Sequence, residues 1–321
     1  MRVLSGIQPT SAPHIGNYFG AIRQFIEMQR EGHEGFYFVA DYHALTTVKD
    51  PAKLKQFTQD VVLDYLALGL DPSRSTLYLQ SAIPEVTELA WLLSCVTGMG
   101  LLEKCHAYKD KVAKGFAADH GLFAYPVLMA ADILIVNANQ VPVGQDQKQH
   151  IEVARDIASS FNHIYGDVLT LPEPMIHKDV AVVPGTDGRK MSKSYGNAIE
   201  IFAEGKPLKK KIMAIVTDSK GVEEAKDPDS NNIFQLMRLF LNQADQLAWA
   251  QRFRAGHMGY GEAKTCLLDA VTEYFRPARE RRAQLAQSPD YVQSVLTQGA
   301  NRARAVAHET MERAKKACGL I

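Results

Sequence analysis

Phe36-Tyr37-Phe38-Val39-Ala40 is a continuous apolar run within the first fifty residues. A strand covered by helices on both faces has this pattern, because neither face of such a strand meets water. The flanking segments fit that environment. Residues 16–30 place apolar side chains at helical spacing, and residues 51–70 form another helical stretch behind the capping pair Asp50-Pro51. The run therefore predicts a parallel strand between two helices.

The same alternation extends on both sides of this run. Extended segments at residues 2–5 and 76–80 predict further strands, and residues 84–97 predict a further helix. Strands that alternate with helices form βαβ units and a parallel sheet. Beyond a stretch rich in Pro and Gly at residues 171–188, the pattern is helical almost throughout. We therefore expect an α/β, Rossmann-type domain over residues 1–200 and an all-helical domain over residues 201–321.

Composition narrows the class of protein. The 321 residues carry 36 Lys and Arg against 36 Asp and Glu, which excludes a uniformly basic nucleic-acid coat. No apolar run is long enough for a membrane span, and the first residues lack a secretory signal pattern. The four cysteines are scattered without a C-x-x-C pair, so we expect neither disulfides nor a metal site built by the protein. Together these features predict a cytoplasmic protein that does not associate with membranes.

Pro13-His14-Ile15-Gly16-Asn17 lies between the first predicted strand and the first predicted helix. The N-terminus of a helix in this position offers unpaired N–H groups and the positive end of the helix dipole, which suit a polyphosphate. Gly16 would admit a nucleotide close to the backbone, and His14 and Asn17 would add donors. The same two side chains also serve commonly as plain helix caps. This stretch taken alone leaves both interpretations open.

Lys190-Met191-Ser192-Lys193-Ser194 forms a second polar motif, flanked by Gly185, Gly188 and Gly196. Two lysines and two hydroxyls on such a loop can neutralise charge that develops on a phosphate leaving group. Most loops rich in Lys and Ser are simply solvated, so the loop alone is a weak signal. Its combination with the His14 turn is more specific, because the two motifs would address the two ends of one triphosphate.

These two motifs carry a family resemblance. Residues 13–17 resemble the HIGH signature of class I aminoacyl-tRNA synthetases, with Asn17 in place of the final His, and residues 190–194 match the KMSKS signature in full. Segments 6–10, 41–44, 128–134 and 141–150 are similar to the bacterial tryptophanyl-tRNA synthetases. The resemblance implies that residues 1–200 form the catalytic domain, which binds ATP and tryptophan, and that residues 201–321 bind the anticodon.

The resemblance also assigns residues to the nucleotide. It implies a catalytic set of Lys190, Lys193, Lys111, His14 and Asn17, and it implies that Lys109 and Lys111 lie near the pyrophosphate. The nucleotide itself would be held by Gln8, Pro9, Thr10, Gly16, Asn17, Gly144, Gln145, Asp146, Val182 (or Val183), Lys190, Met191, Ser192, Lys193 and Ser194. Within this set, the Asp146 carboxylate would hold ribose hydroxyls while Gly144 admits the adenosine closely.

Asp132 is a carboxylate within the apolar helical run of residues 128–134. Burial of an unpaired charge is costly, so this residue is either exposed on the polar edge of its helix or held by a partner. The resemblance implies that it accepts the indole N–H of tryptophan, a group that can only donate. It also implies a pocket formed by Asp132, Gln147, Tyr125, Met129, His43, Gly6, Val141 and Val143. Leu4 stands where the family usually has an aromatic residue.

The resemblance implies a tryptophan–tRNA ligase. Such an enzyme forms tryptophanyl-adenylate from L-tryptophan and ATP, with Mg²⁺ bound to the ATP, and then transfers tryptophan to its tRNA. A homodimer is implied as well. A tyrosyl-tRNA synthetase is the nearest alternative, because a buried Asp serves a phenol as well as an indole. A tRNA-independent nucleotidylyltransferase and a non-catalytic interaction protein are the others. Residues 275–321 carry nine basic and four acidic side chains, which suits either a solvated helix face or phosphate contact.

Overall fold

In a computed structural model of the chain, residues 1–105, 115, 119–144, 147–176 and 182–321 are described. The chain folds into two compact units, each assembled from separate segments. Unit 1 comprises Met1–Ala12, Phe25–Asp179 and Leu285–Ile321, and unit 2 comprises Pro13–Gln24 and Val180–Gln284. This division differs from the single boundary that we expected after residue 200. The function assigned to residues 201–321 stays a prediction.

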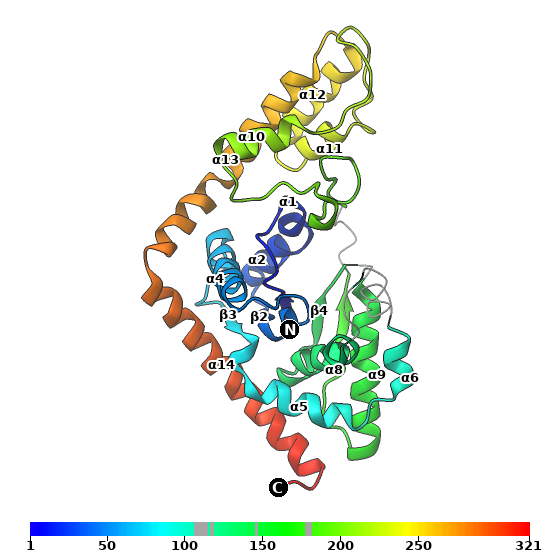
Figure 1. The fold of residues 1–321 in the computed structure, drawn as a ribbon, viewed down its shortest axis with the longest axis vertical. Coiled ribbons are helices and arrows are strands. Elements are labelled where there is room, and N and C mark those ends of the chain that lie inside the picture. The colour runs from blue at the N-terminus through cyan, green and yellow to red at the C-terminus, as the bar shows by residue number, and fades with distance from the viewer. Residues whose placement is uncertain (106–114, 116–118, 145–146, 177–181) are drawn as a thin grey trace. The chain divides into compact units, whose positions relative to one another are not determined.

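Unit 1 contains a parallel sheet of five strands in the order β3-β2-β1-β4-β5 (Figure 1). The strands are β1 (Arg2–Ile7), β2 (Glu34–Val39), β3 (Ser75–Leu79), β4 (Gln140–Pro142) and β5 (Glu173–Met175). The apolar run of residues 36–40 forms most of β2, between β1 and β3, and all five of its residues are buried. The prediction of a doubly covered strand is confirmed.

Helices connect these strands as the sequence pattern indicated. In unit 1 they are α3 (Asp41–Ala44), α4 (Pro51–Leu68), the 3₁₀ turn η2 (Gln80–Ala82), α5 (Pro84–Ser94), α6 (Met99–Glu103), α8 (His120–Ile135) and α9 (Lys148–Tyr165). Asp50 caps α4, because its carboxylate accepts bonds from the amides of Ala52 and Lys53 at 2.9 and 3.2 Å. No helix among the described residues is long and apolar enough to cross a membrane.

Helix α14 (Pro289–Ala317) belongs to unit 1, although we expected it in the helical domain. Its buried side chains Ala303, Ala307 and Met311 join the core that β1, β2, α5, α8 and α9 form. Gly299 lies against the edge strand β3, where a Cβ would be 1.8 Å from the carbonyl oxygen of Leu77. Only glycine permits this approach of a helix to a strand, which covers the exposed edge of the sheet.

Unit 2 is helical. It contains α1 (Ile15–Asn17), the π-helical turn η1 (Tyr18–Ile22), the 3₁₀ turn η4 (Lys193–Tyr195), α10 (Gly205–Met213), α11 (Asn232–Met237), α12 (Gln243–Ala255) and most of α13 (Tyr260–Ala286). Helix α2 (Arg23–Arg30) begins in unit 2 and continues into unit 1. An aromatic cluster joins η1 to α13 through the edge-to-face contact of Tyr18 with Phe275. It also joins η1 to the turn between α11 and α12 through the contact of Phe19 with Phe240.

Candidate functional site

A cavity of about 440 Å³ lies in unit 1 and includes the carboxyl ends of β1 and β4. Ligands bind at this edge of parallel sheets, because the polar loops that follow the strands meet there. All eight residues expected to bind the substrate line this cavity, namely Asp132, Gln147, Tyr125, Met129, His43, Gly6, Val141 and Val143. Segments more than 130 residues apart thus converge on one site, although contact of these residues with a ligand stays a prediction.

Asp132 is the charged centre of this cavity. Its side chain on α8 is 3% exposed, which excludes the alternative of a solvated carboxylate at the helix edge. His43 Nε2 lies 2.8 Å from its Oδ2, and Gln80 Nε2 donates to Oδ1 and Oδ2 at 2.8 and 2.9 Å. Burial raises the pKa of Asp132, whereas the bonds from His43 and Gln80 act in the opposite direction. The carboxylate is therefore desolvated and still an acceptor.

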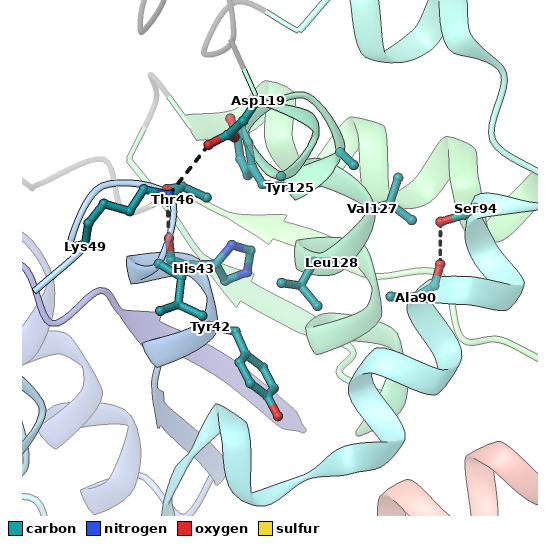
Figure 2. Close-up of a pocket in the computed structure, with 13 residues that line it drawn as sticks. Tyr42, His43, Thr46, Lys49, Ala90, Ser94, Asp119, Tyr125, Val127 and Leu128 are labelled. Carbon is teal, nitrogen blue, oxygen red and sulfur yellow. Dashed lines mark hydrogen bonds and ion pairs between the residues drawn. The ribbon is translucent and has the colours of Figure 1, made fainter. Parts of the chain in front are cut away.

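His43 connects this cavity to a second one of about 370 Å³, whose lining also includes Tyr125. Figure 2 shows both side chains in the second cavity, together with the Lys49–Asp119 ion pair and the bond from the Thr46 hydroxyl to the His43 carbonyl. His43 is 5% exposed and lies on the short helix α3, directly after β2. Its position is thus set by the end of the strand, as the sequence indicated.

Gly6 and Leu4 shape the part of the cavity that β1 provides. A Cβ on Gly6 would lie 2.5 Å from the Phe38 ring on the neighbouring strand, so a larger residue would displace that ring. Leu4 is 2% exposed and lines the cavity. A buried aliphatic side chain therefore forms this part of the cavity wall, at the position for which the resemblance implied an aromatic residue.

The turn around His14 lies in unit 2, where it forms the N-terminal cap of α1. Asn17 N donates to His14 Nδ1 at 3.2 Å, and His14 N donates to Asn17 Oδ1 at 3.0 Å. His14 and Asn17 therefore do act as a helix cap, which was one of the two interpretations of this turn. Burial, and secondarily the charge of Lys193, lowers the pKa of His14 to about 4. His14 is thus neutral at pH 7, and because Nδ1 accepts, Nε2 carries the proton and can donate.

The two signature motifs lie side by side within unit 2. Ile15 N donates to the Ile199 carbonyl at 3.0 Å, and Ile201 N donates to the Pro13 carbonyl at 3.2 Å. Gly16 N lies 3.4 Å from the sulfur of Met191, which is buried. Backbone bonds to residues 199 and 201, together with the contact between Gly16 and the Met191 side chain across 175 residues of sequence, therefore hold the two motifs close to each other.

Asn197 holds the backbone of the second motif through side-chain hydrogen bonds, and nothing in the sequence indicated this role. Its Oδ1 accepts from Ser192 N at 2.8 Å, and its Nδ2 donates to Asp187 Oδ1 at 2.7 Å and to the Lys190 carbonyl at 3.2 Å. The side chain is 2% exposed. A Cβ on Gly185 would collide with it at 2.3 Å, which explains that glycine.

The remaining nucleotide residues divide into three groups. Gln8 lines the cavity of unit 1, and Pro9, Thr10 and Gly144 follow the ends of β1 and β4 in the same unit. Val182 is exposed in unit 2, whereas Val183 is buried and its carbonyl accepts from Met191 N at 2.8 Å. Lys109, Lys111, Gln145 and Asp146 lie outside the described residues. Among the residues described, no cluster of three or more His, Cys, Asp or Glu side chains could hold a metal ion.

The basic residues of segment 275–321 are largely used within the chain. Seven of the nine contact other groups of the protein: Arg276 contacts Glu273 and Glu280, Arg279 the Ile201 carbonyl, Arg282 the Phe202 ring, Arg302 the Pro72 carbonyl, Arg304 Glu85, Arg313 Asn137, and Lys315 Glu88. The net positive charge of this segment therefore does not indicate a surface that binds phosphates. Lys206, Lys209 and Lys210 on α10 are exposed and have no ion pair with any described residue.

Comparison with known proteins identifies the family. The family model for class I tRNA synthetases (W and Y) matches residues 1–276. The chain belongs to this family. Among relatives of this class I synthetase, tryptophan–tRNA ligases from Rhodopirellula baltica and Fusobacterium nucleatum are 56% and 55% identical to it, over 100% of this chain and over 100% and 98% of their own lengths.

A solved structure has the same fold. Tryptophanyl-tRNA synthetase from Campylobacter jejuni, complexed with ADP and tryptophan, matches this synthetase with a TM-score of 0.95 at 50% identity. The match covers 99% of this chain and 100% of the other. The α/β fold with a parallel sheet and a helical region is therefore confirmed as that of a class I synthetase.

Gln80 is the other residue that the sequence analysis missed. It is fully buried and binds both oxygens of Asp132. A signal was present, because Gln80 is the polar last residue of the predicted strand 76–80, at the edge of the sheet where ligands bind. The short helical turns α3 and η2, which follow the neighbouring strands β2 and β3, thus each supply a side chain that contacts Asp132.

Proposed function

We propose that the chain is a tryptophan–tRNA ligase. The observation that carries this proposal is the buried carboxylate of Asp132, which faces an apolar cavity at the carboxyl edge of the sheet. An amino-acid side chain that is large, flat and apolar, with a single N–H donor, complements this cavity in both shape and polarity. The names of relatives that are 45–56% identical to the chain support the same conclusion.

Unit 1 binds and orients tryptophan in this proposal. Asp132 accepts the indole N–H, while Met129, Val141 and Val143 contact the ring faces. Tyr125 and Gln147 line the same cavity and supply oxygen acceptors for the α-ammonium group. Binding at both ends directs the substrate carboxylate, which attacks the α-phosphorus of ATP, so the protein needs no nucleophile of its own.

Unit 2 binds the triphosphate. The bound ADP of the Campylobacter jejuni enzyme supports an adenine nucleotide as the substrate. Neutral His14 donates from Nε2, and Lys190 and Lys193 supply positive charge from the adjacent loop. Mg²⁺ bound to ATP would share the neutralisation of the phosphates. Negative charge grows on the departing pyrophosphate, so the lysines contribute most in the transition state.

The second half-reaction transfers tryptophan to its tRNA. The exposed lysines of α10, which lack ion pairs with described residues, are a surface suited to the phosphate backbone. Anticodon binding within residues 201–321 remains part of the proposal, most directly for the segment that belongs to unit 2. We place the enzyme in the cytoplasm, where the substrates of translation are found and where the four free cysteines stay reduced.

The enzyme acts as a homodimer in this proposal. Trp91 on α5 and Met99 at the start of α6 are 70% and 62% exposed, and we infer that a second copy of the chain covers them. Light scattering on the purified protein and on a Trp91→Glu variant measures this directly. A monomeric mass for both proteins would exclude the dimer.

Pyrophosphate exchange into ATP, run separately with each of the twenty amino acids, tests the function. Tryptophan alone should support rapid exchange, and tRNA charging should then follow with the same amino acid. Exchange with tyrosine instead would establish the tyrosyl alternative. If none of the twenty amino acids supports exchange, the proposal is wrong, and a nucleotidylyltransferase or a non-catalytic protein is favoured.

A further inference from the structure

Gln80 is oriented by bonds on both ends of its amide. Its Oε1 accepts from the backbone amides of Tyr42 and His43 at 3.1 and 3.3 Å. Backbone amides can only donate, so the oxygen must face α3 and the NH₂ group must face Asp132. The side chain is 0% exposed, which leaves no water to substitute for either set of partners. The orientation of this amide is therefore determined by chemistry as well as by shape.

The NH₂ group of Gln80 contacts both carboxylate oxygens of Asp132, at 2.8 and 2.9 Å. A donor placed against both oxygens favours the form of the carboxyl group that accepts at both, which is the ionised form. His43 Nε2 adds a contact at Oδ2 only, at 2.8 Å. Oδ1 accepts the bond from Gln80 and has a lone pair for one further donor.

We propose that Gln80 is a positioning residue that holds Asp132 as a hydrogen-bond acceptor and thereby makes the cavity selective for side chains ending in a donor. This inference rests on the proposed tryptophan specificity. Gln80 lies on η2 and joins three separate elements, because it binds α3 through its oxygen and α8 through its nitrogen. Without its donor, the buried Asp132 would be less well held as an anion and would accept the indole N–H less well.

A sulfur analogue of tryptophan isolates this effect. β-(Benzothiophen-3-yl)alanine has sulfur in place of the indole N–H and nearly the same shape, so it can fill the cavity without donating a bond. We define the discrimination as the ratio of kcat/KM for tryptophan to kcat/KM for this analogue in pyrophosphate exchange. Gln80→Met should lower the discrimination by roughly tenfold or more, mainly through a raised KM for tryptophan.

Gln29→Met is the matched control. Gln29 is also a buried glutamine of unit 1, and its Oε1 accepts from Asp71 N at 2.8 Å and from Ser75 Oγ at 2.9 Å. Its replacement should lower thermal stability without a change in discrimination. If Gln80→Met lowers kcat/KM for both amino acids by the same factor, Gln80 has only a structural role and the inference is wrong. If the wild-type protein fails to activate tryptophan, the proposed function itself is wrong.

Gln80→Glu tests the donor alone, because it keeps the shape and the oxygen that accepts from α3. The introduced carboxyl and Asp132 would share one proton at low pH, and two adjacent negative charges would result when that proton leaves. A proton on Asp132 blocks acceptance, so the discrimination should lie below the wild-type value at pH 6 and rise as this proton leaves towards pH 9. His43, Asp41 and Tyr78 also interact electrostatically with Asp132 and could contribute a pH dependence of their own. The discrimination of the variant is therefore compared with that of the wild type at each pH. A discrimination that equals the wild-type value at every pH would overturn the inference.

Discussion

Replacement of Gly299 by alanine measures how closely α14 packs on the edge of the sheet. The new Cβ would lie 1.8 Å from the Leu77 carbonyl oxygen, whereas a carbon and an oxygen in contact are about 3.3 Å apart. The helix must therefore move by about 1.5 Å, and even smaller gaps forfeit a large part of the dispersion energy. Ala303, Ala307 and Met311 are buried on the same helix and would move with it.

The expected size follows from two opposing effects. Overpacking costs about 3 kcal/mol, and the helix propensity of alanine over glycine returns about 1 kcal/mol. The net loss of about 2 kcal/mol corresponds to a fall in Tm of about 4–8 °C, measured by circular dichroism. Gly261→Ala on α13 is the control, because Gly261 is exposed and its Cβ would meet no atom within 4 Å. If Gly299→Ala is as stable as this control, α14 does not pack on β3 as described.

Three further predictions concern the site. Asp132→Asn should lower kcat/KM for tryptophan by about tenfold or more in pyrophosphate exchange, because an amide accepts the indole N–H less well than a carboxylate; unchanged activation would make Asp132 structural. Lys193→Ala should lower kcat by about 10²–10³ with little change in KM for ATP, and a normal kcat with a raised KM would contradict a transition-state role. Because the folded pKa of His14 is about 4 against 6.5 unfolded, the stability it contributes is present above pH 6.5 and is lost as pH falls towards 4, by about 3 kcal/mol. Urea denaturation at pH 4.5 and 7 should show a smaller difference in His14→Gln than in the wild type, and equal differences would refute the shift.

The sequence predicted those parts of the fold that depend only on residues close to one another in the chain. The apolar run at 36–40 and the cap at Asp50 require only neighbouring residues, and both are confirmed. The burial of Asp132 was one of two alternatives, because an apolar helix indicates a buried environment but does not reveal the partners of a charge. Those partners, His43 and Gln80, come from other segments.

Long-range packing accounts for what was missed. The segment that forms α14 has a helical pattern with more basic than acidic side chains, which suited a separate helical domain equally well. Its true contacts are made by small residues, Gly299, Ala303 and Ala307, whose spacing of four reveals a helix face but not the surface that the face meets. Asn197 likewise acts only through the loop that folds around it.

The interleaving of the two units along the chain affects how the protein folds during synthesis. Tyr18 and Phe19 leave the ribosome early, but Phe240, Tyr274 and Phe275, against which they pack, follow more than 200 residues later. At about 5–20 residues per second, these aromatic rings wait roughly 10–50 s for their partners. Through that interval the nascent chain presents an aromatic segment suited to chaperone binding, and the β3 edge of the sheet stays uncovered until residues 289–317 are made.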